Sequence, residues 1–152
     1  MKQEEIQLLL KDLSARLMYG VICQVDDGAA GLNDGKLVEI DISKELVRFD
    51  DDGYWDAYID NVKPYLRSMS SMTEDEEKEY NSFIIGQQPF DSDFSAYPIE
   101  HKILYEFDVN SYIDWLNAHH FDYRNLIGKG LALEAPKYIY KKYEYKYIKE
   151  NR

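Results

Sequence analysis

The stretch SYIDWLNAHHFDYRNLIGKGLALEAP, Ser111 to Pro136, contains the densest apolar periodicity of the chain and decides the expected fold of its C-terminal half. Tyr112, Trp115 and Leu116 recur at i, i+3 and i+4, which places three apolar side chains on one face of a helix. Asn110 or Ser111 can serve as its N-cap. We therefore expect an amphipathic helix from about Ser111.

The second half of this stretch predicts another short helix. Asp122 can cap it, and Gly128 and Gly130 can end it by adopting positive φ. Together the two helices would form a helix-turn-helix unit over residues 111–128 that packs on the rest of the chain. Its expected core residues are Trp115, Leu116, Phe121, Leu126 and Ile127.

The N-terminal segment 2–13 predicts another amphipathic helix. Its four apolar side chains occur at 0, +3, +4 and +7, which is one face of a helix: Ile6, Leu9, Leu10 and Leu13. A helix of this length is marginal by itself and should pack on the neighbouring strands.

Residues 16–70 change to the alternating pattern of β-strands. Expected strands are 17–25, 36–43, 44–50 and 54–59, with turns at Asp34-Gly35, Ser43-Lys44 and 50–53. Four short strands without helical patterns between them indicate a small antiparallel barrel or curled sheet, SH3-like or related. The expected fold class is therefore α+β, with an N-terminal helix and a C-terminal helix-turn-helix unit.

The segment after these strands is less regular. Pro64 has no N–H for a sheet ladder, so residues 60–73 are interpreted as an extended exit from the sheet. Thr73 and Glu76 form a capping box, which predicts a helix over 73–85 that leans on the barrel through Tyr80 and Phe83. A long loop over 86–101 and one more strand over 102–108 precede the C-terminal unit.

Residues 1–136 are expected to form one α+β domain, with a Tyr/Lys-rich strand or tail over 137–152. The tail carries 6 Lys+Arg and 2 Asp+Glu (+4), whereas residues 1–136 carry 12 and 27 (−15), giving the net charge of −11. An acidic body favours a basic partner and repels nucleic acid, while the tail could stack on nucleic acid. The candidate binding residues of the tail are Tyr138, Tyr140, Lys141, Lys142, Tyr143 and Tyr145.

No pattern in the sequence predicts catalysis, a cofactor or a bound metal. His119 and His120, near Asp114, Asp122 and His101, are the only candidate metal or acid–base cluster, but adjacent residues of a helix point about 100° apart. A structural role at the helix end is favoured over metal binding. Asp50–Gly53 lacks the acid spacing of a calcium loop and is interpreted as a turn.

A cytoplasmic location is expected. Cys23 is the only cysteine, which fits a reducing compartment, and it is expected to be a buried apolar residue without nucleophilic function. Neither a secretion signal nor an apolar run long enough for a membrane span is recognised. A DNA-binding role for the helix-turn-helix unit is disfavoured because the body is acidic.

Three segments of the chain resemble a widespread family of small proteins from gut-dwelling bacteria and their phages. They are YGV (19–21), PYLRSMSSM with the adjoining acidic residues (64–79), and IDWLNAHHFDYRNLIGKGLALEAP (113–136). Ser68 stands where the family pattern has a proline. The resemblance implies a phage or mobile-element setting and a cytoplasmic location, and it brings no activity with it.

These observations predict a non-enzymatic protein-interaction or regulatory module, in a sharper form an acidic binder of a basic host protein. The alternative is a nucleic-acid-binding accessory protein that uses the barrel and the Lys/Tyr tail. An enzyme built around His119 and His120 is the third hypothesis. The identity of the partner and the oligomeric state stay open, although the edge near Tyr54–Ile59 could pair a second copy.

Overall fold

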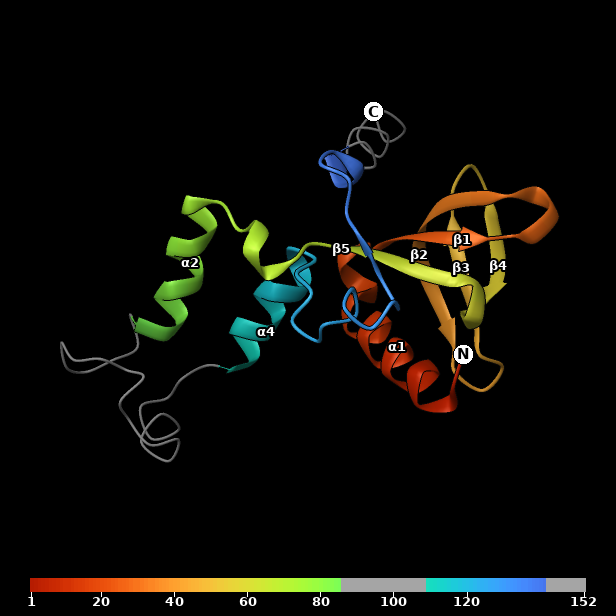
Figure 1. Ribbon diagram of the computed structural model, residues 1–152, viewed down its shortest axis with the longest axis horizontal. Helices are drawn as coiled ribbons and strands as arrows, with labels where there is room; N and C mark the ends of the chain where they lie inside the picture. Colours follow the sequence, from red (N-terminus) through yellow and green to blue (C-terminus); the bar gives the residue numbers. More distant parts are fainter. Residues whose placement is uncertain (86–108, 142–152) are drawn as a thin grey trace.

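The computed structural model describes residues 1–85 and 109–141, arranged as an α+β fold (Figure 1). Its α-helices are α1 (Gln3–Arg16), α2 (Glu74–Ile85) and α4 (Val109–Ala118). Its strands are β1 (Ile22–Asp26), β2 (Leu32–Asp41), β3 (Leu46–Asp50), β4 (Tyr54–Tyr58), β5 (Val62–Leu66) and β6 (Leu133–Glu134). The loop expected over 86–101 and the strand expected over 102–108 lie outside the described residues.

The six strands form one sheet in the order β4-β3-β2-β1-β5-β6. All neighbouring strands are antiparallel except β5 and β6, which are parallel. The expected α+β class, with an N-terminal helix and an antiparallel sheet, is thereby confirmed. The sheet does not close within the described residues, because β4 and β6 end the strand order and do not pair with each other.

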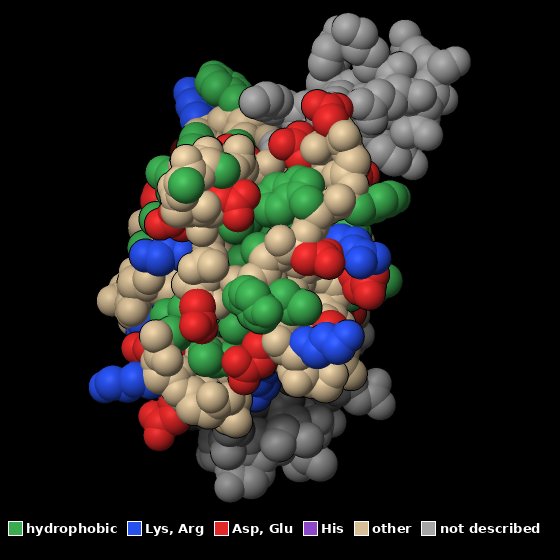
Figure 2. All heavy atoms as spheres, turned by 90° about the vertical axis from the view of Figure 1, so that its right-hand side faces the viewer, with side chains coloured by type: hydrophobic (Ala, Val, Ile, Leu, Met, Phe, Trp, Pro, Cys, Tyr) green, Lys and Arg blue, Asp and Glu red, His purple; other side chains and the backbone are tan. Residues whose placement is uncertain are grey.

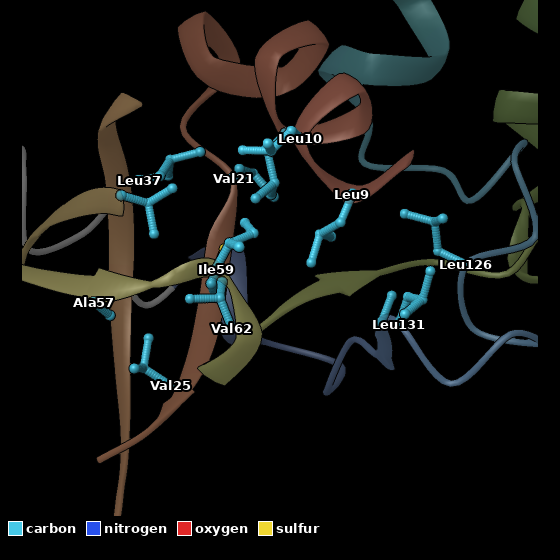
Figure 3. Packing of buried hydrophobic residues seen from close by; sticks show 14 of the residues in the cluster. Leu9, Leu10, Val21, Val25, Leu37, Ala57, Ile59, Val62, Leu126 and Leu131 are labelled. Atoms are coloured by element: carbon cyan, nitrogen blue, oxygen red, sulfur yellow. The ribbon is translucent and has the colours of Figure 1, made fainter. Parts of the chain in front are cut away.

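Helix α1 packs beside the sheet and confirms the helix expected over 2–13, with one further turn to Arg16. Its four predicted apolar side chains are all buried in the core. Figure 3 shows Leu9 and Leu10 pointing from α1 into the space beside the sheet, with Leu126 and Leu131 of the C-terminal segment nearby. Each buried leucine stabilises the fold by about 1.5–3 kcal/mol, so this face of α1 holds the two halves of the chain together.

The first strand is shorter than the alternation predicts. Residues Leu17–Tyr19 form a 3₁₀ turn, and Gly20 comes next at φ +67°, so β1 begins only at Ile22. Cys23 is buried, as predicted, and so are Val21 and Val25 on the same face and Ile22 on the other face.

The expected turn at Asp34-Gly35 is wrong. Both residues lie inside β2, and the connection from β1 is made by residues 27–31. Gly35 is needed here for its missing side chain, because a Cβ would come within 2.8 Å of Phe49 Cβ and 2.9 Å of Trp55 Cζ2. The glycine therefore marks a close approach within the sheet. The turns around 42–45 and 50–53 are confirmed.

Pro64 lies inside β5 opposite Cys23, so the expectation of an extended exit segment is wrong. In an antiparallel ladder every second residue pair exchanges no backbone hydrogen bonds. Cys23–Pro64 is such a pair, because the neighbouring Ile22 amide and Tyr65 carbonyl are the groups that face each other between β1 and β5. On the other side of β5, β6 pairs only with Tyr65 and Leu66. The missing N–H of Pro64 therefore leaves no gap in the ladder.

The capping box at the start of α2 is confirmed. The Glu76 amide donates to Thr73 Oγ1 (3.2 Å), and the Thr73 amide donates to Glu76 Oε1 (3.1 Å). Glu76 also accepts two hydrogen bonds from the Arg67 guanidinium, both 2.7 Å. This bidentate pair ties α2 to the end of β5 and lowers the pKa of Glu76 to about 2.

Helix α2 packs on α4, away from strands β1–β4 (Figure 1), and not on the barrel as expected. The hydroxyls of Tyr80 and Tyr112 are 2.8 Å apart, and the Trp115 indole donates to Glu79 Oε2 (2.8 Å). Phe83 contacts the ring of Tyr112 edge-on and the ring of Trp115 at a tilt. The aromatic side of α2 is therefore used to hold the two helices together.

The second helix of the expected helix-turn-helix unit does not form, and α4 begins at Val109. After α4 the chain makes a series of turns in which the Asp122 carboxylate accepts the amides of Leu126 (2.8 Å) and Ile127 (2.9 Å). Asn125 has φ +57°, which interrupts any helix between Asp122 and Gly128. Gly130 has positive φ, as predicted, whereas Gly128 does not.

The expected core of this unit is confirmed for Leu116, Phe121 and Leu126, which are fully buried. Trp115 and Ile127 are only partly buried. Trp115 stacks on Phe121 with ring centroids 5.6 Å apart and keeps its N–H directed at the surface carboxylate of α2.

A buried ion network joins α1 to the C-terminal segment. Arg16 and Asp12 are completely buried, and the guanidinium donates to Asp12 through Nε (2.8 Å) and Nη2 (3.1 Å). Arg16 Nη2 also donates to the carbonyl of Phe121 (2.7 Å), and Arg124 donates to Asp12 (3.2 Å). The Asp12 carboxylate thus accepts hydrogen bonds from two guanidinium groups, one on α1 and one in the C-terminal segment.

Replacing Asp12 should destabilise the protein strongly. Asp12→Ala leaves the buried charge of Arg16 without its carboxylate, which costs about 3–5 kcal/mol. Urea unfolding measures the loss, with the exposed neighbour substitution Lys11→Ala as the control. A loss below about 1 kcal/mol for Asp12→Ala would contradict the importance of this network.

Glu76→Gln should lower stability by about 2–3 kcal/mol at pH 7, since glutamine retains the capping box but not the charge that pairs with Arg67. The pKa of Glu76 is lowered in the folded state, so its contribution is complete above the unfolded pKa, near 4.5, and disappears as the pH falls toward about 2. Unfolding free energies of the variant and the wild type should converge over this range. Glu77→Gln, one exposed position away, should show no such convergence.

Candidate functional site

The predicted binding residues of the tail are only partly among the residues that the structure describes. Tyr138, Tyr140 and Lys141 are described, whereas Lys142, Tyr143 and Tyr145 lie outside the described residues. Tyr138 is 60% exposed, and the amines of Lys137 and Lys141 lie 5.5 and 5.8 Å from its ring centroid. This part of the tail is therefore accessible.

The hydroxyl of Tyr140, another predicted binding residue, is used inside the fold. Its hydroxyl donates to the carbonyl of Tyr65 and accepts the amide of Ile22 (2.5 and 3.3 Å). The register of β1 and β5 ends at Cys23 and Pro64, so Ile22 and Tyr65 would be the next pair of the ladder. The Tyr140 hydroxyl thus bridges the two backbone groups at the point where β1 and β5 separate.

His120 supports Tyr140 from the other side. The two rings stack with centroids 3.7 Å apart and planes 7° from parallel. Burial, with a smaller effect of the Arg16 charge, lowers the pKa of His120 to about 3, so the imidazole is neutral at physiological pH. Burial likewise raises the pKa of Tyr140, which therefore stays protonated and can donate to Tyr65.

The two histidines contact different partners. His119 Nδ1 lies 2.8 Å from the Trp115 carbonyl, which confirms the role expected of a histidine at a helix end. His120 is buried at φ +61° and its carbonyl accepts the Arg67 amide (2.8 Å). In residues 1–85 and 109–141, no three His, Cys, Asp or Glu side chains are placed to share a metal ion. His101 lies outside this part.

Tyr140→Phe should destabilise the protein by about 1–3 kcal/mol, because the ring still stacks on His120 while Ile22 and Tyr65 each lose a buried hydrogen-bond partner. Urea unfolding measures this loss, and the Ile22 amide should exchange its hydrogen faster. Tyr138→Phe, at an exposed position two residues earlier, is the matched control. Equal stability of the two variants would show that the bridge contributes nothing.

A second group of accessible tyrosines lies on β4, an outer strand of the sheet. We call Asp50, Asp52, Tyr54, Asp56 and Tyr58 the β4 edge surface. Tyr54 is 73% exposed and Tyr58 is 63% exposed, and the three carboxylates are exposed as well. Figure 2 looks at the molecule from the right-hand side of Figure 1, where β4 lies, and shows hydrophobic side chains interspersed with acidic and basic ones.

Asp56, the central carboxylate of this surface, forms an ion pair with Arg48. Asp56 Oδ1 accepts from Arg48 Nε (2.8 Å), and Arg48 Nη1 reaches Glu39 (3.2 Å). The hydrogen bond from Arg48 lowers the pKa of Asp56, so the carboxylate stays ionised. The three charges leave a net −1 at the centre of the surface.

A shallow hollow beside Arg48 has a volume of about 160 Å³. Its lining is formed by Glu39, Asp41, Lys44, Leu46, Val47, Arg48 and Asp56. Pockets for cofactors and drug-sized ligands usually measure about 300–1,000 Å³ and are mostly apolar. The hollow fits a protruding polar side chain better than a small-molecule ligand.

Cys23 is buried, and desolvation raises the pKa of its thiol, so it carries no reactive thiolate. None of the helices in residues 1–85 and 109–141 combines the length and the apolar character needed to span a bilayer. No family model, no curated protein and no solved structure matches this chain. A function therefore has to be inferred from its own residues.

Sequence reasoning finds only a weak signal for the β4 edge surface. The YWDAY alternation predicts a strand, and the edge near Tyr54–Ile59 is a place where another strand could pair. The sequence contains fourteen tyrosines and does not show which of them are exposed, so the exposed side chains of this surface are not predicted. The buried Asp12–Arg16 pair is also missed, although its i, i+4 spacing beside Leu9 and Leu13 is a usable signal.

Proposed function

We propose that this protein is a non-enzymatic protein-interaction or regulatory module of phage or mobile-element origin that binds a basic partner protein. The observation that carries the proposal is the β4 edge surface, where Tyr54 and Tyr58 are exposed between carboxylates. Tyrosine offers a large apolar area with a polar tip, which suits an interface. Residues 44–60 contain two Lys+Arg and six Asp+Glu, a net −4, which favours a basic partner.

We also propose that β1–β5 form an SH3-like sheet. The order β4-β3-β2-β1-β5, with the outer two strands joined by only three residues (Ile59–Asn61), supports it. So short a connection requires the sheet to curl until its two sides approach. A cytoplasmic location is part of the same proposal and is supported by the single, buried cysteine.

Affinity capture with the tagged full-length chain tests the proposed function. The lysate should come from a gut bacterium of the kind in which the resembling proteins occur, and capture is compared at low and high salt, with and without nuclease. We expect to capture a basic protein that stays bound after nuclease treatment and dissociates at high salt. The Tyr54→Ser/Tyr58→Ser variant should not capture it. Tyr138→Ser, which removes a similarly exposed tyrosine from the tail, should leave capture unchanged.

Capture that nuclease abolishes, or that the two β4 substitutions do not affect, would contradict binding through the β4 edge surface. The double variant must unfold at the same urea concentration as the wild type for this comparison to hold. Both tyrosines are exposed, so little change in stability is expected.

Nucleic-acid binding through the tail is the alternative function, favoured by the exposed Tyr138 with Lys137 and Lys141 near its ring. Deletion of residues 137–152 is not a clean test, because it also removes the Tyr140 bridge. Tyr138→Ser/Lys141→Glu leaves Tyr140 in place and should abolish a salt-sensitive gel shift of single-stranded nucleic acid. A shift that this variant retains would argue against the tail.

A further inference from the structure

Within the described part of the chain, the backbone of β4 presents unpaired hydrogen-bonding groups at three positions. The Ile59 amide donates to the Glu45 carbonyl (2.9 Å), beyond one end of the β3–β4 register. The Asp51 amide donates to the Gly53 carbonyl (3.1 Å), beyond the other end. These two bonds fix which alternate residues of β4 bond to β3.

Gly53 and Ile59 both bond to the β3 side, and every second residue of an antiparallel strand does so. Trp55 and Ala57, which lie between them at this spacing, therefore also bond to β3. The residues between them, Tyr54, Asp56 and Tyr58, therefore direct their N–H and C=O groups away from β3. No other described strand pairs with this side of β4. Three successive alternate residues thus form an open edge, and the same residues expose their side chains.

This edge lacks the features that usually prevent strand pairing. Strand β4 contains neither proline nor lysine, and its register with β3 is regular over five pairs. The irregularity of the sheet lies elsewhere, between β2 and β3 at Leu37 and Glu39. Asp56 is the one charged residue of β4; it contacts Arg48 and stays ionised, so the edge opposes an acidic strand without opposing a basic one.

A second copy of the chain is a poor occupant of the edge. Antiparallel pairing of β4 with itself, centred on Asp56, would place Asp56 opposite its own copy and Tyr54 opposite Tyr58. Like charges directly opposite each other destabilise a strand pair. The net −4 of residues 44–60 would be brought against an equal charge.

We propose that β4 accepts an extended, basic segment of the partner protein as an added strand of the sheet. The three open residues supply the backbone hydrogen bonds, and alternate side chains of the ligand supply specificity. A lysine or arginine belongs opposite Asp56, and aromatic or apolar residues belong opposite Tyr54 and Tyr58. This inference rests on the proposed function and adds how the partner is bound and what its segment contains.

Tyr58 offers a test that separates backbone from side chain. Its φ is −72°, close to the value of about −65° at which proline is fixed, and its N–H is not used by β3. Tyr58→Pro and Tyr58→Ala both remove the ring, but only proline removes the outward N–H. Both variants of the full-length chain should unfold at similar urea concentrations.

The probe is the capped peptide KTYTKTYTK, whose lysines and tyrosines share one face of a strand. It should bind the wild type in a salt-sensitive manner, and Tyr58→Pro should bind at least tenfold more weakly than Tyr58→Ala. In the wild type the peptide should slow hydrogen exchange of the Tyr54, Asp56 and Tyr58 amides, whereas Trp55 and Ala57 are already protected. The peptide ETYTETYTE is the control and should not bind.

Equal binding by the proline and alanine variants, no binding of the lysine peptide at millimolar concentration, or unchanged exchange at the three amides would each overturn strand addition. Self-association of the chain through β4 would also overturn it. If protein capture depends on Tyr54 and Tyr58 but the amides stay unprotected, the proposed function stands and strand addition fails. If the peptide protects the three amides but no protein is captured, strand addition stands and the proposed function fails.

Discussion

The burial of Arg16 constrains the path of the chain at the junction between α1 and the C-terminal segment. A guanidinium removed from water costs several kcal/mol unless it is paired and hydrogen-bonded. Asp12 supplies the charge and the Phe121 carbonyl supplies a further acceptor, so the C-terminal segment has to meet α1 at this point. From there Arg67 exchanges backbone hydrogen bonds with His120 and Asp122, which directs the end of β5 toward the helical half.

Eight of the nine tyrosines in residues 1–85 and 109–141 fall into two groups. One group places its hydroxyls on internal partners: Tyr65 on Asp34, Tyr80 and Tyr112 on each other, Tyr123 on Asn117, and Tyr140 on Tyr65. The other group, Tyr54, Tyr58 and Tyr138, is exposed. A tyrosine-rich composition by itself therefore overstates the binding surface, and the exposed members have to be located from the fold.

Short sequence patterns correctly predict the elements that are stabilised by residues close together in the chain. The apolar stripe of α1, the Thr73–Glu76 capping box and the two hairpin turns depend on neighbouring residues and are confirmed. The errors arise where distant residues decide: Gly35 is required by Phe49 and Trp55, and Pro64 is tolerated because of strand register. The second helix fails because Asp122 caps a turn that Asn125 interrupts, and no pattern reveals the hydroxyl of Tyr140 between β1 and β5.

The acidic composition and the open edge explain each other in physical terms. An edge strand without proline, lysine or a bulge is a site for aggregation unless something else opposes pairing of identical chains. Here the carboxylates of the β3–β4 turn and Asp56 repel a second copy while the backbone groups of β4 stay available. Repulsion of this kind discriminates by charge alone: it excludes an acidic strand and admits a basic one. In the proposed mode of binding, the same residues would keep free copies of the protein apart and select a basic partner.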